Sequence, residues 1–130
     1  MKLSTDTFPF YDQCRSLFGV DIDTGTVFTY GDTIHARCGV PPDLYEHEQT
    51  HSIQQERMGK DLWWKTYLAD EKFRMKQELE AYRKQYWFFC TQTRDRNRRA
   101  VFLHKIASDL SGTMYGNILT LQEAKTRIQA

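Results

Sequence analysis

The chain has 130 residues with a formal net charge of +1, and 40% of the residues are hydrophobic and 14% aromatic. This composition favours one folded domain over residues 1–130 and excludes a disordered chain, and the near-neutral charge gives no reason to expect nucleic acid as a partner. The N-terminus lacks a signal-peptide core and no apolar run reaches the roughly 18 residues of a membrane helix, so we expect a cytoplasmic protein without a membrane partner.

The first third of the chain predicts a short helix and a small β-hairpin. Residues 8–18 are compatible with a helix after Pro9, and Asp21-Ile-Asp-Thr-Gly25 is typical of a turn. Residues 26–30 and 33–37 are β-rich and are separated by Gly31-Asp32, which suits a tight two-residue connection. We interpret His35 as an exposed cross-strand residue. The unpaired spacing of Cys14, Cys38 and Cys90 predicts free thiols.

A helix is predicted from the Pro41-Pro42-Asp43 entrance to a stop at Gly59, with Asp43 and Glu46 as a capping pair. This helix contains His47-Glu48-Gln-Thr-His51, the HExxH pattern. Histidines four residues apart lie on one helical face, where both imidazoles can bind one Zn²⁺, and Glu48 then lies beside the metal as a general base for a water that the metal activates. The alternative is a coincidence of two partly buried histidines.

A second helix, capped by Asp70 and reaching about residue 91, follows a Trp-rich segment that we expect to pack in the core through Trp63 and Trp64. Glu78 lies on the apolar face of this helix, whereas Glu80 lies on the solvent face. An inward carboxylate needs compensation, which a metal ion or a salt bridge to Arg74 would provide. The C-terminal part predicts two more helices, one beginning in the arginine cluster at residues 94–99 and one opened by Thr120 and Glu123.

Together, HExxH and Glu78-Leu-Glu-Ala81 resemble the gluzincin class of zinc metallopeptidases, and the ExxA form is most similar to the branch that includes the CAAX-prenyl and heat-shock membrane proteases. Residues 30–82 carry this resemblance, and their surroundings look similar to small phage or bacterial proteins of minimal zincin type. The metzincin pattern is excluded, because Gln54 and Arg57 stand where that class has glycine and histidine.

The resemblance implies several roles. Glu78 would be the third metal ligand, and Tyr82, which stands where the family usually has an aspartate, would be a weaker hydrogen-bond partner of a ligand histidine. Residues 33–37 would form an exposed edge strand that lines the substrate cleft. A group beyond the third ligand would stabilise the oxyanion; Tyr115 is the preferred candidate and His104 the other.

We therefore expect an α+β, minimal zincin-like fold: a small hairpin or sheet, an active-site helix, a second ligand-bearing helix and a helical C-terminus. The predicted function is that of a zinc-dependent metallopeptidase, a hydrolase that acts on a peptide or protein substrate, with His47, His51 and Glu78 as Zn²⁺ ligands and Glu48 as base. The alternative is a zinc-stabilised structural or interaction protein, of phage or bacterial type, with little or no peptidase activity.

Overall fold

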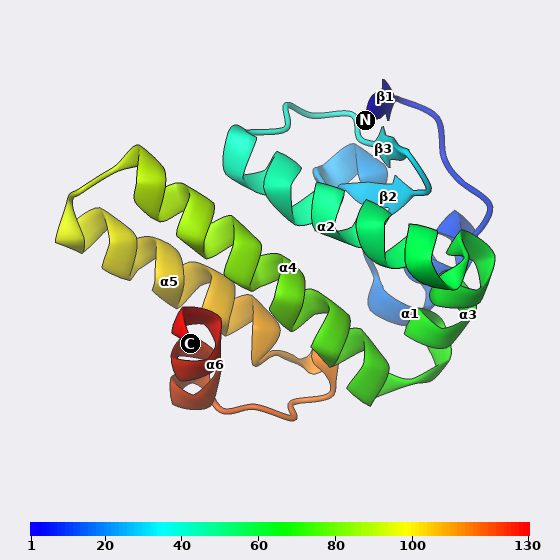
Figure 1. Ribbon diagram of the computed structural model, residues 1–130. Coiled ribbons are helices and arrows are strands. Elements are labelled where there is room, and N and C mark those ends of the chain that lie inside the picture. Colours follow the sequence, from blue (N-terminus) through cyan, green and yellow to red (C-terminus); the bar gives the residue numbers. More distant parts are fainter.

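The computed structural model describes all 130 residues and has an α+β fold with a helical C-terminus, as predicted (Figure 1). None of its helices combines the length and the apolar character needed to cross a membrane. The three cysteines are free. The helices and strands are β1 (Lys2–Ser4), α1 (Tyr11–Phe18), β2 (Phe28–Tyr30), β3 (Thr33–His35), α2 (Pro42–Met58), α3 (Lys60–Ala69), α4 (Glu71–Gln92), α5 (Arg96–Leu110) and α6 (Leu121–Gln129).

The sheet has the strand order β1-β3-β2. The predicted hairpin is present as β2 and β3, which pair antiparallel around Gly31 and Asp32, and the positive φ of 62° at Gly31 suits the tight connection. β1 pairs parallel with β3 on its other side. The prediction that residues 33–37 form an exposed edge is therefore wrong, because β3 is the central strand. His35 is buried rather than exposed, and its Nδ1 lies 2.7 Å from the carbonyl oxygen of Asp6.

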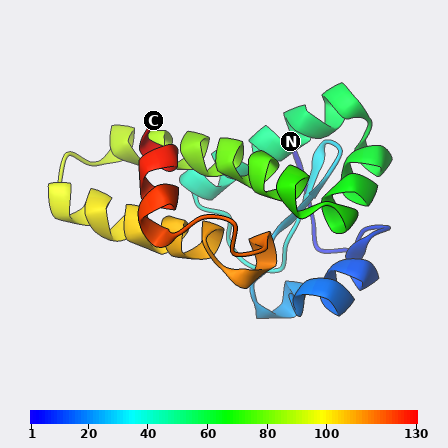
Figure 2. The same cartoon turned by 90° about the horizontal axis from the view of Figure 1, so that it is seen from below.

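The two helices that carry the HExxH and ExxA motifs pack directly against each other. α2 and α4 run in opposite directions side by side, joined through α3, with β2 against α2 and with α5 and α6 on the far side of α4 (Figure 1). From below, α6 crosses both α4 and α5 (Figure 2). The motif helices thus form the middle layer of the molecule.

Two hydrophobic clusters flank this middle layer. The N-terminal cluster packs α1 and the sheet against α3, and Trp63 and Trp64 are buried within it, as predicted. The C-terminal cluster joins α4, α5 and α6 around residues such as Leu110 and Ile128. Each side of the α2 and α4 pair is therefore fixed by its own apolar contacts, which hold the motif side chains in place between them.

Helix ends follow the predicted caps with one exception. Asp70 caps α4, and Thr120 with Glu123 forms a complete capping box on α6. The predicted capping pair of Asp43 and Glu46 is wrong, because α2 begins two residues earlier than this pair requires, with Pro41 as its N-cap and no side-chain cap. The carboxylate of Asp43 instead accepts a hydrogen bond from a side chain of α4, a tertiary contact that outcompetes the local cap.

Candidate metal centre

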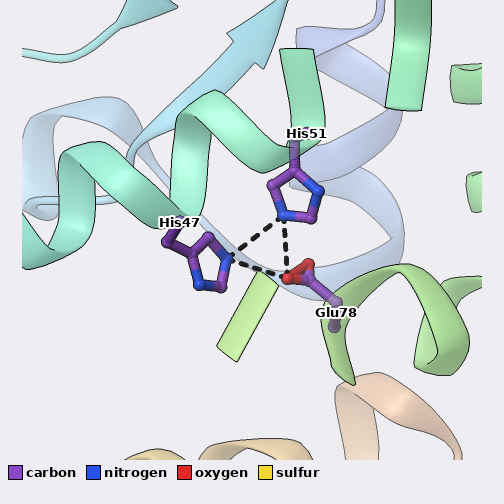
Figure 3. Close-up of side chains that lie close together, drawn as sticks. All are labelled: His47, His51 and Glu78. Carbon is purple, nitrogen blue, oxygen red and sulfur yellow. Dashed lines mark hydrogen bonds and ion pairs between the residues drawn. The ribbon is translucent and has the colours of Figure 1, made fainter. Parts of the chain in front are cut away.

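Side chains from α2 and α4 converge on one point between the helices. His47 Nε2 and His51 Nε2 lie 3.0 and 2.9 Å from Glu78 Oε1, and the two imidazole nitrogens lie 3.1 Å apart (Figure 3). All three residues are buried. The spacing of four residues places the histidines on one face of α2, and Glu78 faces them because it lies on the inward side of α4. This buried group can hold a metal ion.

The Nδ1 atom of each histidine contacts the side-chain oxygen of a glutamine. His47 Nδ1 lies 2.9 Å from Gln85 Oε1, and His51 Nδ1 lies 2.9 Å from Gln54 Oε1. An amide oxygen only accepts hydrogen bonds, so both Nδ1 atoms must carry the proton and donate. In a neutral imidazole with this tautomer, Nε2 presents a lone pair. Both lone pairs point toward Glu78.

The donor set fits a small divalent cation. Three acceptor atoms lie within 3.1 Å of one another, an arrangement that is repulsive unless a cation or a proton lies among them. Four ligands placed tetrahedrally at about 2.0–2.1 Å from zinc are separated by about 3.3 Å, a few tenths of an ångström more than the separations here. Two imidazoles and one carboxylate are also a ligand set used by open zinc sites.

The second oxygen of Glu78 is held by Tyr67, whose hydroxyl donates to Oε2 over 2.7 Å. The alternative explanation for the inward carboxylate, a salt bridge to Arg74, is excluded by the side-chain contacts. Arg74 is buried, but its guanidinium donates to the carbonyl oxygens of Tyr67, Leu68 and Met114 instead. The charge of Glu78 is therefore balanced only by the two histidines.

This arrangement shifts the pKa of both partners in the ion pair. Burial alone raises the pKa of Glu78, but the positive charge of His51 and the hydrogen bonds from both histidines outweigh it and lower the pKa well below its usual value. Burial likewise lowers the pKa of His51, but the charge and the hydrogen bond of Glu78 outweigh it and raise the pKa to about 9. Without a metal, one proton therefore lies among the two histidine Nε2 atoms and Glu78 Oε1 at neutral pH.

Glu48 lies beside this cluster. Its Oε2 lies 3.7 Å from His47 Nε2, and its Oε1 accepts a hydrogen bond from the hydroxyl of Thr29 on β2 over 3.3 Å. Burial raises the pKa of the Glu48 carboxyl, and the charges of His47 and His51 offset only part of that rise. A carboxylate whose pKa is moved toward neutrality suits proton transfer at physiological pH.

Of the other predicted residues, Tyr82 and Tyr115 reach the site and His104 does not. The Tyr82 ring packs edge-on against the His47 ring with centroids 4.6 Å apart, so Tyr82 is not the hydrogen-bond partner of that histidine. Tyr115 is buried beside Tyr82, and burial followed by the charge of Glu78 raises its pKa well above the ordinary value. His104 is exposed on α5 and does not line the cavity at the site.

A cavity of about 460 Å³ opens onto the cluster. Just over half of its lining residues are hydrophobic. Its walls come from α1, from residues 25–29, from α2, α3 and α4, and from α5 with the turn that holds Tyr115. Lys105 and Asp109 on α5 are charged groups in the wall. Residues 33–37 do not line it, because β2 lies between β3 and α2.

Sequence reasoning did not find Gln85 and Tyr67 as partners of the ligands. Gln85 lies two helical turns after Glu78, so the inward face of α4 was an available signal. Gln54 lies three residues after His51, so helical spacing places it on the same face of α2 as the histidines. Tyr67 had no comparable signal, because its contact with Glu78 depends on how α3 folds back against α4.

Comparisons of this chain with protein-family models, with curated proteins and with solved structures find no match.

Proposed function

We propose that this protein is a zinc-dependent metallopeptidase of gluzincin type. The observation that carries the proposal is the convergence of His47, His51 and Glu78 with Glu48 beside them at the end of a cavity. Two neutral imidazoles and a carboxylate provide three protein ligands and leave room for a fourth, the composition of open catalytic zinc sites. The resemblance of the HExxH and ExxA motifs to gluzincins supports the same conclusion.

Zinc, when bound, polarises a carbonyl group and makes a neighbouring water more acidic. Glu48 then acts as general base: one of its carboxylate oxygens takes a proton from the water as the water oxygen attacks the scissile carbonyl carbon. The same carboxyl group passes that proton to the leaving nitrogen as the carbon–nitrogen bond breaks. The hydrogen bond from Thr29 holds Glu48 in the orientation that faces the cluster.

The cavity supports a peptide as substrate. Its mostly apolar lining suits side chains next to the scissile bond, and its volume lies in the range typical of sites for small ligands or short peptide segments. The Tyr115 hydroxyl is the candidate donor to the developing oxyanion. A Tyr115→Phe variant is expected to lose activity by a factor of about 100 while it keeps its metal; unchanged kcat would remove this role.

The alternative is a metal-stabilised interaction protein. Tyr82 favours it, because this residue stands where the family usually has an aspartate and packs against the His47 ring instead. Glu48 argues against it, because a metal with a purely structural role does not need a buried carboxylate beside the ligands. The two functions predict the same metal content and differ only in turnover.

The test therefore measures metal and turnover separately. Elemental mass spectrometry of the zinc-reconstituted protein is expected to give about one zinc per chain, which Glu78→Ala loses and which the exposed control Glu56→Ala keeps. A peptide library then reports cleavage, which Glu48→Gln abolishes without loss of zinc. No zinc in the folded wild type would refute the metal site, and zinc without cleavage of any peptide would favour the interaction protein.

A further inference from the structure

The two histidines have hydrogen-bonded surroundings of the same kind. In each case a glutamine side chain connects the imidazole to a carboxylate nearer the surface. Gln85 Oε1 accepts from His47 Nδ1, and Gln85 Nε2 donates to Asp43 Oδ2 over 3.0 Å. Gln54 Oε1 accepts from His51 Nδ1 in the same way, and Gln54 Nε2 donates to Glu80 Oε1 over 3.1 Å. The sequence places these residues on two helices, so each chain of hydrogen bonds also joins α2 to α4.

The carboxylate decides which way the amide faces. A glutamine amide can rotate by 180° and present either its oxygen or its NH₂ group to the imidazole. A carboxylate accepts hydrogen bonds and cannot donate them, so it holds the NH₂ group and turns the oxygen toward Nδ1. The imidazole must then keep its proton on Nδ1, which leaves Nε2 free for a metal.

The two connections differ in how firmly the amide is held. Gln54 Nε2 has a second acceptor, the carbonyl oxygen of Gln77 at 3.1 Å, which fixes the amide even without Glu80. Gln85 Nε2 has only Asp43. Asp43 is also partly buried at the start of α2, whereas Glu80 is exposed and competes with water for its partner. The orientation of the Gln85 amide thus depends on a single carboxylate.

We propose that Asp43 is a positioning residue for the metal centre: through Gln85, it sets the tautomer of His47. Glu80 contributes little to the corresponding connection at His51. The proposal rests on the proposed metal site but concerns residues that do not touch the metal. In Asp43→Asn, the new amide can donate as well as accept, so the Gln85 amide is free to turn its NH₂ group toward His47. Nδ1 then has to accept, and the proton moves to Nε2, where it blocks the metal.

The same reasoning predicts a rescue. In the double variant Asp43→Asn with Gln85→Glu, the new carboxylate accepts from His47 Nδ1 and from the amide of the asparagine. His47 again keeps its proton on Nδ1 and its lone pair on Nε2. Loss of the hydrogen-bond partner of a metal-ligating histidine typically weakens metal affinity 10–100-fold. Asp43→Asn is therefore expected to weaken zinc binding by at least about tenfold, and the double variant is expected to recover most of that loss.

The experiment combines two readouts on wild type, Asp43→Asn, the double variant and the control Glu80→Gln. The tautomer of His47 is read from ¹⁵N histidine spectra of the metal-free protein, and the zinc affinity from competition with a chromophoric chelator. The expected result is the Nδ1–H tautomer in all but Asp43→Asn, with a loss of affinity in that variant alone. Circular dichroism confirms that each variant is folded.

Several results would overturn the proposal. One is an Asp43→Asn protein with an unchanged His47 tautomer, and another is an affinity loss in Glu80→Gln as large as that in Asp43→Asn. A third is the absence of recovery in the double variant, since a purely structural effect of Asp43 on α2 would not be reversed at residue 85. Because the tautomer is measured without metal, a wild type that binds no zinc would refute the proposed function and leave the role of Asp43 to be decided by the spectra.

Discussion

The affinity for the metal is expected to rise steeply with pH, because His51 holds a proton where the metal would bind. Glu78 raises the pKa of His51 from 6.5 to about 9 in the metal-free protein. A metal ligand must be deprotonated, so binding displaces this proton. At pH values below the His51 pKa of about 9, each unit by which the pH falls weakens the apparent affinity tenfold. At pH values above this pKa the affinity no longer depends on the protonation of His51. Between pH 7 and 9 the affinity is therefore expected to increase about 50-fold, or by about 2 kcal/mol.

Two measurements check this expectation. Isothermal titration calorimetry at pH 7, in buffers with different ionisation enthalpies, is expected to show the release of about one proton per zinc ion bound. Competition with a chelator across the same pH range gives the slope of the affinity directly, after correction for protonation of the chelator. An affinity that is constant between pH 7 and 9, or binding without proton release, would refute the reasoning.

The cause of the shift can be tested without any metal. In Glu78→Gln the charge that raises the pKa of His51 is removed while the burial that lowers it remains. The His51 pKa, followed by the chemical shift of its Cε1–H group, is expected to fall from about 9 to below the ordinary value of 6.5. A value that stays near 9 in this variant would show that a group other than Glu78 is responsible.

Three further variants test the surroundings of the site. Tyr67→Phe leaves Glu78 Oε2 without its donor, so zinc affinity by chelator competition is expected to fall about tenfold. Trp63→Phe removes part of a side chain that is 1% exposed and its hydrogen bond to Gln77, with an expected loss of about 1–3 kcal/mol in the free energy of urea unfolding. Gly116→Ala, at φ 77° with its new Cβ 2.6 Å from Glu71 Oε2, is expected to cost about 1–2 kcal/mol in the same assay, whereas Gly39→Ala, which meets no neighbouring atom, is expected to change little.

The parts of the fold with local signals could be predicted from the sequence. The turn at Gly31 and Asp32, the cap at Asp70 and the capping box at Thr120 depend on a few neighbouring residues, and all three are present. Glu78 could also be placed toward the histidines, because helical periodicity alone separates it from the solvent-facing Glu80.

The features that sequence reasoning missed depend on contacts between distant segments. β1 has only three residues, and its parallel pairing with β3 leaves no local pattern, so the sequence predicts an edge where the structure has the central strand. The cap expected at Asp43 failed for the same reason, since the partner of its carboxylate lies 42 residues away on α4. Local propensity gives way where a tertiary hydrogen bond offers the same group a buried partner.

The choice of glutamine behind both histidines follows from the balance of buried charge. Glu48 and Glu78 already place two carboxylates within the site, and their combined charge when ionised matches that of one divalent cation. With Asp43 and Glu80 unchanged, a carboxylate in place of Gln85 or Gln54 would add a third buried negative charge, and an unbalanced buried charge costs several kcal/mol. Neutral amides avoid this cost and still fix the proton on Nδ1. The carboxylates that orient the amides, Asp43 and Glu80, lie nearer the surface, where water screens their charge.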